Sequence, residues 1–393
     1  MPQNRRRFGK EEDALNRIRI QSRILTALLL ALAFLLCACT SLQENAPDTP
    51  AAPLSLWALR DDPMTETLYA LTVLYNAEDP EAPVSVRIYD DEQSLANAMD
   101  SARPDLLLCG QDHALALYGQ GRLKRISDED APLPQFTETF LALSDCVGVS
   151  YFPLGADVQL LAVNPSVPTQ TDAAVLSNMD RLCRAASDKG KQEGQAFFSA
   201  DSFAGLFAAC MAQTNEVFLA RRQEDIRSEA YRRLYNLLAD AAYTGGLTYD
   251  SADPVGDVAS GTLSCALSRS SALVGADPSL FFYPMPVMQG GSKLCLAEIY
   301  GLAVTSPFDR NLPYVGDFLR GLFAQETSLT SVLDAGFLPA CDAPWPEGGG
   351  SFIGALRATA DYYRFLSPDA AEGYRLRGRD FEADFRDALA LLQ

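Results

Sequence analysis

The stretch from Val149 to Asn164 constrains the fold of this chain more than any other. It opens with apolar and aromatic residues, is interrupted at Pro153 and Gly155, shows a lone Asp157, and continues as a mostly apolar run to Val163. A near-continuous apolar run is typical of a strand buried on both faces, whereas proline donates no ladder hydrogen bond and glycine has no side chain to pack. The pattern predicts two strands in two different sheets, with Asp157 at the junction between two lobes. Small-molecule sites are commonly built at such interfaces.

The composition is that of an acidic globular protein. The chain has 393 residues, of which 48% are hydrophobic and 21% charged, so it is long enough for two domains. Its net charge is −19. Residues 1–38 carry seven basic and three acidic residues; without them, 25 basic residues face 48 acidic ones, a net charge of −23. Phosphate binding needs a basic surface, so this charge argues against a nucleic-acid partner.

The chain offers little for catalytic or metal chemistry. His113 is the only histidine, and none of the nine cysteines forms a C-x-x-C pair. Beyond Cys39 seven cysteines remain, mostly in apolar runs, and we expect buried free thiols there rather than a disulfide framework. The sequence contains no nucleophile elbow, P-loop, H-E-x-x-H or dinucleotide fingerprint. We therefore expect no enzymatic activity, no metal and no cofactor.

Residues 1–38 predict a lipoprotein signal peptide. A basic segment precedes an apolar run from Ile24 to Leu36, which is short for a membrane span and typical of a secretory signal. The run ends in Leu36-Cys37-Ala38-Cys39, which resembles a bacterial lipobox and implies lipidation of Cys39 on the extracytoplasmic face of the cell membrane. An uncleaved signal anchor is the alternative, and Asn4 to Lys10 also resembles a twin-arginine signal. Residues 39–53 lack apolar periodicity and are expected to form a flexible tether.

From Leu54 on, strand patterns alternate with helix patterns. Strands are expected at 54–59, 84–89 and 105–109, and helices at 63–75, 94–101 and 113–118. This alternation is typical of an α/β domain with a parallel sheet. Beyond the junction, helices are expected at 176–189, 203–212, 224–243, 313–324, 352–365 and 381–392, and strand-like segments at 196–198, 265–267 and 294–304, whereas residues 280–287 carry two prolines.

Five segments resemble, in the same order, those of a known protein family. They are Pro104–Leu108 followed by Asp112, Tyr118, Gly121, Leu123 and Ile126; Pro153, Asp157 and Asn164; Ser260–Thr262; Tyr283–Pro286 with Gly290–Gly291 and Gly301–Val304; and Gly336–Ala340. Their order and spacing are similar to those of the extracellular solute-binding proteins of ABC importers, of the maltodextrin/sugar type (family 1-like). The likeness covers nearly all of residues 54–393, although Pro165 stands where that family usually has lysine.

The resemblance implies an α/β, two-lobed periplasmic-binding-protein type II fold, in which each lobe is a mostly parallel sheet flanked by helices and a hinge joins the lobes. Lobe one would contain residues 54–155 and 295–338, and lobe two residues 156–294 and 339–393. A small solute, a sugar or oligosaccharide, would be captured as the lobes close and delivered to ABC permease subunits in the membrane. The protein would act as a monomer held by its lipid anchor.

Ligand contacts are expected where strands and crossovers end. Asp112 and Asp157 match cleft carboxylates of the family, which accept hydrogen bonds from sugar hydroxyls; a helix N-cap for Asp112 and a solvated turn for Asp157 are the alternatives. Trp57 would stack on a sugar ring or a cation, or pack in the core. The predicted ligand-binding set is Trp57, Tyr89, Asp90, Asp112, Asp157, Asp201, Phe203, Arg269 and Trp345.

Two features leave other functions open. The chain has only two tryptophans, so an aromatic-lined sugar cleft would be thin, and Cys109 lies at a usual cleft position. A degenerate surface lipoprotein that keeps the fold as a scaffold or sensor, without transport, is therefore an alternative function. A cleft lined by aspartates, among them Asp62 and Asp90, would instead suit a cationic solute such as a polyamine.

Overall fold

The computed structural model describes residues 53–390, apart from residues 127–135, 167–172, 215–228, 250, 325, 343–344 and 347. The predicted signal peptide, nearly all of the predicted tether and Cys39 lie outside the described residues. In the part of the chain that is described, no helix combines the length and the apolar character that crossing a bilayer requires.

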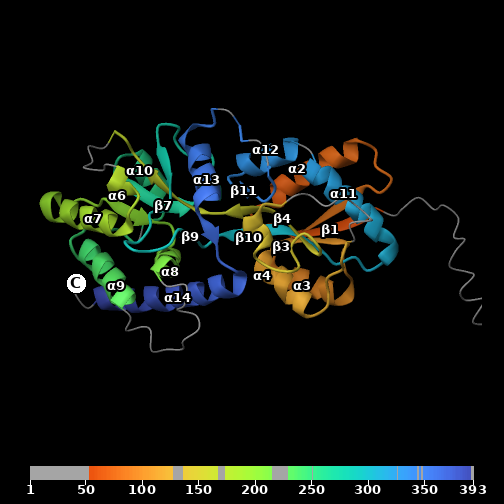
Figure 1. The fold of residues 1–393 in the computed structure, drawn as a ribbon, viewed down its shortest axis with the longest axis horizontal. Coiled ribbons are helices and arrows are strands. Elements are labelled where there is room, and N and C mark those ends of the chain that lie inside the picture. Colours follow the sequence, from red (N-terminus) through yellow and green to blue (C-terminus); the bar gives the residue numbers. More distant parts are fainter. Residues whose placement is uncertain are drawn as a thin grey trace, which may run out of the picture. The chain divides into compact units, whose positions relative to one another are not determined.

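One lobe is built on a six-stranded sheet with the strand order β11-β4-β10-β3-β1-β2. Its strands are β1 (Leu54–Leu59), β2 (Val84–Tyr89), β3 (Leu106–Gly110), β4 (Tyr151–Asp157), β10 (Glu298–Val304) and β11 (Leu338–Pro339). The helices around it are α2 (Thr65–Ala77), α3 (Glu92–Ser101), α4 (Gln111–Gly119), α11 (Leu312–Ala324) and α12 (Glu326–Asp334) (Figure 1). The predicted alternation of strands and helices between residues 54 and 119 is confirmed. Farther along the chain, α12 was not predicted.

The other lobe is built on a four-stranded sheet with the order β6-β7-β5-β8. Its strands are β5 (Gln159–Val163), β6 (Phe198–Ala200), β7 (Cys265–Arg269) and β8 (Phe281–Pro284). Its helices include α6 (Ala173–Leu176), α7 (Met179–Glu193), α8 (Phe203–Thr214), α9 (Glu229–Tyr243), α10 (Pro254–Ala259) and α13 (Gly350–Tyr362). Smaller elements are α5 (Glu138–Leu141) and the two-stranded pair of β9 (Leu294–Cys295) and β12 (Arg364–Phe365). The residue boundaries predicted for the lobes stay a prediction.

Both sheets are mixed, which corrects the expectation of mostly parallel sheets. β1 pairs in parallel with β2 and β3, but β10 lies antiparallel between β3 and β4. In the smaller sheet β5 is antiparallel to both β7 and β8, and β6 is parallel to β7. The antiparallel strands β10 and β5 each follow a segment that has just crossed from the other sheet. They therefore enter their sheet from the side of the junction, against the direction of the strands that they pair with.

The junction predicted around Asp157 is present, but the break lies elsewhere than expected. β4 runs through Pro153 and Gly155 as far as Asp157, and the chain leaves for β5 at Val158. Proline is tolerated inside β4 because the register with β10 shifts there: Tyr300 pairs with Gly155 and Gly301 with Pro153, which is the one-residue offset of a β-bulge.

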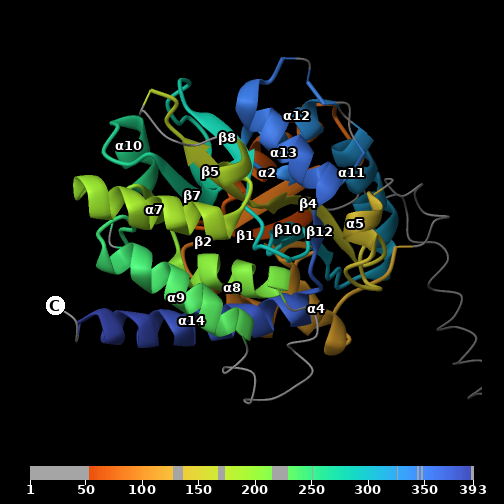
Figure 2. The same ribbon diagram turned by 60° about the vertical axis from the view of Figure 1, so that its left-hand side comes forward.

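The C-terminal helix α14 (Pro368–Ala390) is longer than the helix predicted at 381–392. It packs along α8 and α9, and its first turns reach α4 of the six-stranded lobe (Figures 1 and 2). Phe381 stacks on Phe207, and Phe385 packs against Phe203, so the second half of α14 is anchored in the aromatic core of the smaller lobe. This packing brings charged residues of its first half to the junction between the lobes.

Candidate functional site

Two cavities of about 120 Å³ each lie where the two sheets meet. The first is lined by the end of β3, the start of α4, the start of β10 and the first turns of α14. The second is lined by the β4–β5 junction, the start of α8, the end of β7 and α14. Glu298 and Arg375 line both cavities and form the wall that they share.

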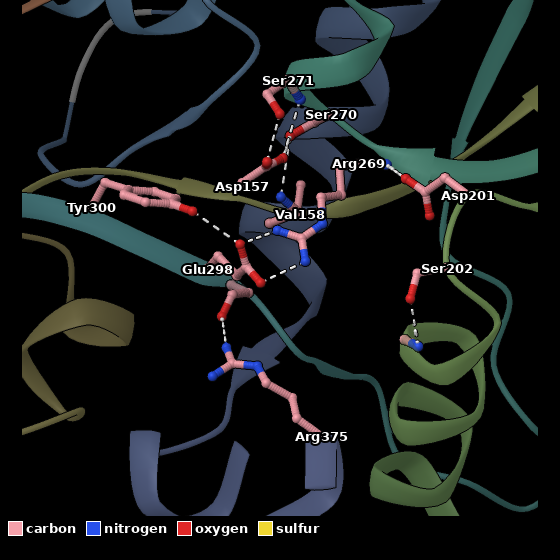
Figure 3. Close-up of polar contacts among 12 residues, drawn as sticks. Asp157, Val158, Asp201, Ser202, Arg269, Ser270, Ser271, Glu298, Tyr300 and Arg375 are labelled. Carbon is pink, nitrogen blue, oxygen red and sulfur yellow. Dashed lines mark hydrogen bonds and ion pairs between the residues drawn. The ribbon is translucent and has the colours of Figure 1, made fainter. Parts of the chain in front are cut away.

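An ion pair between the lobes lies at this wall. Arg269, at the end of β7 in the smaller sheet, contacts both carboxylate oxygens of Glu298, at the start of β10 in the larger sheet (Figure 3). The Tyr300 hydroxyl donates a hydrogen bond of 3.0 Å to the same carboxylate. Burial alone would raise the pKa of Glu298, but the hydrogen bonds and the charge of Arg269 lower it below its ordinary value. Glu298 is therefore an ionised carboxylate whose charge is already paired.

A second ion pair crosses the junction from the C-terminal helix. Arg375 of α14 lies 2.8 Å from the Asp112 carboxylate at the start of α4, and it donates a 3.0 Å hydrogen bond to the carbonyl oxygen of Ala297. Burial raises the pKa of Asp112, and the charge of Arg375 opposes this increase. Two parts of the chain that are more than 250 residues apart thus meet at one charged contact.

Asp157 holds the crossover between the lobes together. Its Oδ1 accepts hydrogen bonds from the Ser270 hydroxyl at 3.0 Å and from the Ser271 N–H at 3.1 Å. Its Oδ2 accepts from the Ser271 hydroxyl at 2.5 Å (Figure 3). Burial raises the pKa of this carboxyl, and the hydrogen bonds from Ser271 lower it in part. Asp157 also lines the second cavity. It therefore lies at the predicted junction, where it is buried and hydrogen-bonded and is not a solvated turn residue.

Asp62 is a desolvated carboxylate on the loop after β1. The Met64 N–H donates a 3.0 Å hydrogen bond to its Oδ1. Burial raises the pKa of Asp62 to about 6, and the hydrogen bond from Met64 offsets only part of this increase. Its charge also contributes, after burial and the contribution of Glu298, to the raised pKa of Tyr300. Asp62 therefore adds negative potential to the larger lobe's side of the junction.

Three of the nine predicted residues line these two cavities: Asp112, Asp157 and Arg269. Two predicted aromatic residues lie instead in the core. Trp57 and Tyr89 are 6% and 7% exposed and pack on each other, with ring centroids 5.2 Å apart and the guanidinium of Arg87 over both rings. Asp90 is an exposed partner of Arg60 at 2.7 Å.

The predicted residues at the start of α8 are also structural. Asp201 accepts a hydrogen bond from the Arg269 N–H (Figure 3). It also accepts one from the Ser268 hydroxyl, and so fixes the loop before α8 to β7. Phe203 is buried and packs against the aromatic side chains of α14, because the first turn of α8 faces the core of the smaller lobe. It is therefore a core residue and not a wall of either cavity.

Trp345 lines a different cavity. This third space, of about 140 Å³, lies between β11, α5 and α13, and Phe140, Leu338, Pro339 and Asp361 are among its other lining residues. None of them lines the first two cavities. The structure thus does not bring Trp345 together with Asp112, Asp157 and Arg269.

Glu298 and Arg375 were not predicted as site residues. Glu298 begins β10, within a segment that was predicted to be strand-like. Nothing in the sequence indicates that its carboxylate pairs with Arg269, 29 residues earlier in the chain. Arg375 lies in the half of α14 that the periodicity did not predict. The cavities hold paired charges and hydrogen-bonding groups, which suit the binding of a polar molecule.

The cysteines do not line the two junction cavities. The seven within the described residues are all free and buried, as the sequence predicts. Burial raises the pKa of each of their thiols. Among the described side chains, no group of three His, Cys, Asp or Glu residues is arranged to hold a metal ion.

Comparison with known proteins identifies the fold. No protein-family profile and no curated protein matches the sequence. The structure is similar to the cyclic alpha-maltosyl-1,6-maltose binding protein of Arthrobacter globiformis, with a TM-score of 0.66 at 16% identity, over 86% of this chain and 94% of that chain. It is similar to the GacH receptor of Streptomyces glaucescens, solved unliganded and with acarbose, with a TM-score of 0.64 at 14% identity, over 84% and 92% of the two chains.

A third similar structure is a probable secreted solute-binding lipoprotein of Streptomyces coelicolor, with a TM-score of 0.66 at 15% identity, over 85% of this chain and 98% of that chain. At these identities the matches establish a shared fold. The architecture expected from the sequence is confirmed: this chain has the two-lobed α/β fold of sugar-type extracellular solute-binding proteins.

Proposed function

We propose that this protein binds a small polar solute, of the sugar class, between its two lobes. The observation that carries the proposal is the pair of cavities at the lobe junction, lined by residues from both sheets and from α14. Proteins that share this fold include binders of a maltose derivative and of acarbose. The charged side chains of the site are paired with one another, which fits a binding site better than a catalytic one.

The charges at the junction do not favour a cationic solute. Asp112 is paired with Arg375, and Glu298 is paired with Arg269. Asp157 is held by two serines, and Arg379 also lines the second cavity. A polyamine would have to compete with Arg375 for Asp112, with Arg269 for Glu298 and with the serine hydroxyls for Asp157.

We propose further that the solute is handed to the permease of an ABC importer. The support is the lipobox-like end of residues 1–38, which implies an anchor at Cys39 on the extracytoplasmic face of the membrane, and the tether of residues 39–53. In this proposal the folded lobes act as a monomer beside the membrane, and the lobes close on the solute before it is transferred.

One observation favours a second function, that of a scaffold or sensor without transport. Each cavity is smaller than the ~300–1,000 Å³ of typical ligand sites, and two ion pairs bridge the lobes across them. A protein that no longer binds a solute would keep these ion pairs, because its lobes would not need to separate.

A thermal-shift screen separates the two functions. Purified protein is heated with neutral oligosaccharides, amino acids, peptides and polyamines; a solute that binds only the folded state raises the melting temperature with its concentration. Asp157→Asn, which changes a carboxylate that lines the second cavity without breaking either ion pair, should weaken the shift, whereas Asp90→Asn, which changes an exposed carboxylate paired with Arg60, should leave it unchanged. No shift with any class at millimolar concentration would favour the scaffold function.

A further inference from the structure

The two tryptophans of this chain differ in what covers their rings. Trp57 is buried against Tyr89, and the guanidinium of Arg87 lies 5.8 Å from the centroid of its ring. Trp345 is only half-buried, and within the described ranges it has no ring contact, cation contact or hydrogen bond. It lines the cavity of about 140 Å³ between β11, α5 and α13 (the Trp345 cavity). The aromatic surface of Trp345 is therefore open to a ligand.

The inner wall of the Trp345 cavity is apolar. It includes Phe140 of α5, Leu333 of α12 and Leu338 of β11, all of which are buried. An apolar cavity of about 150 Å³ holds one molecule the size of benzene. The Trp345 cavity is nearly as large, so it suits a ligand of about six to eight non-hydrogen atoms. Its wall favours a ligand with an apolar body.

The charged side chains that line the Trp345 cavity are both acidic. They are Asp342 and Asp361, which are exposed, and none of the described lining residues is basic. Asp361 lies 3.9 Å from Arg357, but both side chains are more than half exposed, so water weakens this pair. Asp342 has no hydrogen-bonding or ionic partner among the residues that the structure describes. The entrance of the cavity is therefore negatively charged, and its inner wall is apolar.

The Trp345 cavity lies apart from the junction cavities. α12 and α13, which help to line it, are on the opposite side of the sheets from α4 and α14, which line the first junction cavity (Figures 1 and 2). No residue lines both the Trp345 cavity and a junction cavity. A ligand in the Trp345 cavity would thus be a different molecule from the solute bound between the lobes.

We infer that the Trp345 cavity is a second binding site, and that its ligand is a small organic cation of the alkylammonium class, such as choline. The methyl groups of the cation would contact the apolar wall, and its positive charge would lie against the indole ring and the two carboxylates. A neutral molecule of the same shape would gain the apolar contacts alone. A metal ion suits the site poorly, because the inner wall offers it no oxygen ligands.

Tryptophan fluorescence tests the inference, because Trp57→Phe leaves Trp345 as the only tryptophan of the chain. This variant is titrated at constant ionic strength with choline, with tetramethylammonium, and with dimethylbutanol, the neutral alcohol in which carbon replaces the nitrogen of choline. We expect both cations to change the emission in a saturable way, and dimethylbutanol to bind at least about tenfold more weakly than choline. Calorimetric titration of the native protein should give the same order of affinities, and it does not depend on the folding of Trp57→Phe.

Single variants, measured by calorimetry, assign the binding to this cavity. Asp342→Asn and Asp361→Asn should each weaken choline about threefold to tenfold, because each removes one negative charge from a partly solvated entrance. Trp345→Leu should weaken it about twofold to thirtyfold, the range of a cation–aromatic contact. Trp345→Phe keeps a ring and serves where the leucine variant does not fold; its affinity should be intermediate. Asp334→Asn is the matched control: Asp334 is exposed next to Leu333 but does not line the cavity, so choline affinity should be unchanged.

Three outcomes would overturn the inference. If dimethylbutanol binds as tightly as choline, the cavity takes apolar molecules and the ligand class is wrong. If the cations bind but neither the emission of Trp345 nor the affinity of Asp342→Asn changes, they bind elsewhere on this acidic protein. If neither cation binds at millimolar concentration, the cavity is no site for organic cations. Each of these results leaves the proposed solute binding between the lobes unaffected, because the two sites share no lining residue.

Discussion

Among single residues, Asp62 is the clearest case of a carboxylate that the fold removes from water. Burial raises its pKa to about 6 from an ordinary value of 3.8, and no arginine or lysine is paired with it among the described residues. Between these two pH values the folded state binds a proton that the unfolded state has released. Stability therefore falls as the pH rises from about 4 to about 6, and the loss is complete above that window.

Asp62→Asn should remove this loss. We expect the free energy of unfolding to rise by about 1–3 kcal/mol at pH 8, since a carboxyl pKa raised by two units corresponds to roughly that amount, and to be unchanged near pH 3.5. Urea unfolding at both pH values measures the difference. Asp61→Asn, at the exposed neighbouring position, is the control. Equal stability of Asp62→Asn and the native protein at pH 8 would show that the carboxylate is well solvated.

Single residues also show what the sequence can and cannot predict about the site. Asp112, Asp157 and Arg269 were predicted because they occupy positions where the family that the sequence resembles places ligand contacts. Gln159 carried a usable signal, as the lone polar side chain in the apolar run from Val158 to Val163. Trp57 and Phe203 were expected in the site but lie in the core. The sequence cannot distinguish these two positions, because the local pattern around an aromatic residue at the end of a strand or the start of a helix is the same whether the side chain faces a ligand or the core.

At the scale of elements, the pairing of β4 and β10 depends on a close approach of two backbones. A Cβ added at Gly301 would lie 2.5 Å from the carbonyl oxygen of Phe152 and 2.6 Å from the Cα of Pro153. These are backbone atoms next to the bulge, so they cannot move aside without shifting a strand of the central sheet.

Gly301→Ala should therefore lower the free energy of unfolding by about 1–3 kcal/mol, as overpacking does in a well-packed core. Gly354→Ala is the matched control. Beyond its chain neighbours and the nearby backbone of α13, a Cβ added at Gly354 would meet no described atom within 4 Å, and alanine in a helix should raise the stability by up to ~1 kcal/mol. Urea unfolding of both variants checks the pair, and equal effects of the two substitutions would argue against the close approach.

The elements that were predicted correctly are those whose sequence pattern is local. The strands and helices between residues 54 and 119 have clear periodicity, and the division of the junction into β4 and β5 follows from one long apolar run. The mixed character of the sheets was missed because the position of β10 between β3 and β4 depends on partners far away in the chain. The first half of α14 was missed because its charged and small residues show no apolar stripe.

At the scale of the whole molecule, the two ion pairs at the junction connect the lobes. Glu298 and Asp112 belong to the larger lobe, and their partners Arg269 and Arg375 come from the smaller one. These contacts favour the arrangement in which the cavities are small. A movement of the lobes that widens the cavities must separate at least one of these ion pairs.

The double variant Asp112→Asn/Glu298→Gln should loosen the lobes. We expect small-angle X-ray scattering of the unliganded protein to give a larger radius of gyration for this variant than for the native protein. Asp90→Asn, which removes a surface ion pair within one lobe, should leave it unchanged. An unchanged radius for the double variant would mean that apolar contacts, and not the ion pairs, hold the lobes in place.

Hydrogen exchange tests most directly whether the solute binds between the lobes. It is measured with and without a saturating amount of the neutral oligosaccharide that gives the largest thermal shift. We expect slower exchange in the segments that line the junction cavities, which are residues 110–112, 157–159, 202–205, 296–300 and 371–379. Residues 137–141 and 338–342, beside the cavity that holds Trp345, should exchange as before. Protection confined to those last two segments would place the ligand outside the junction and would show that the solute does not bind between the lobes.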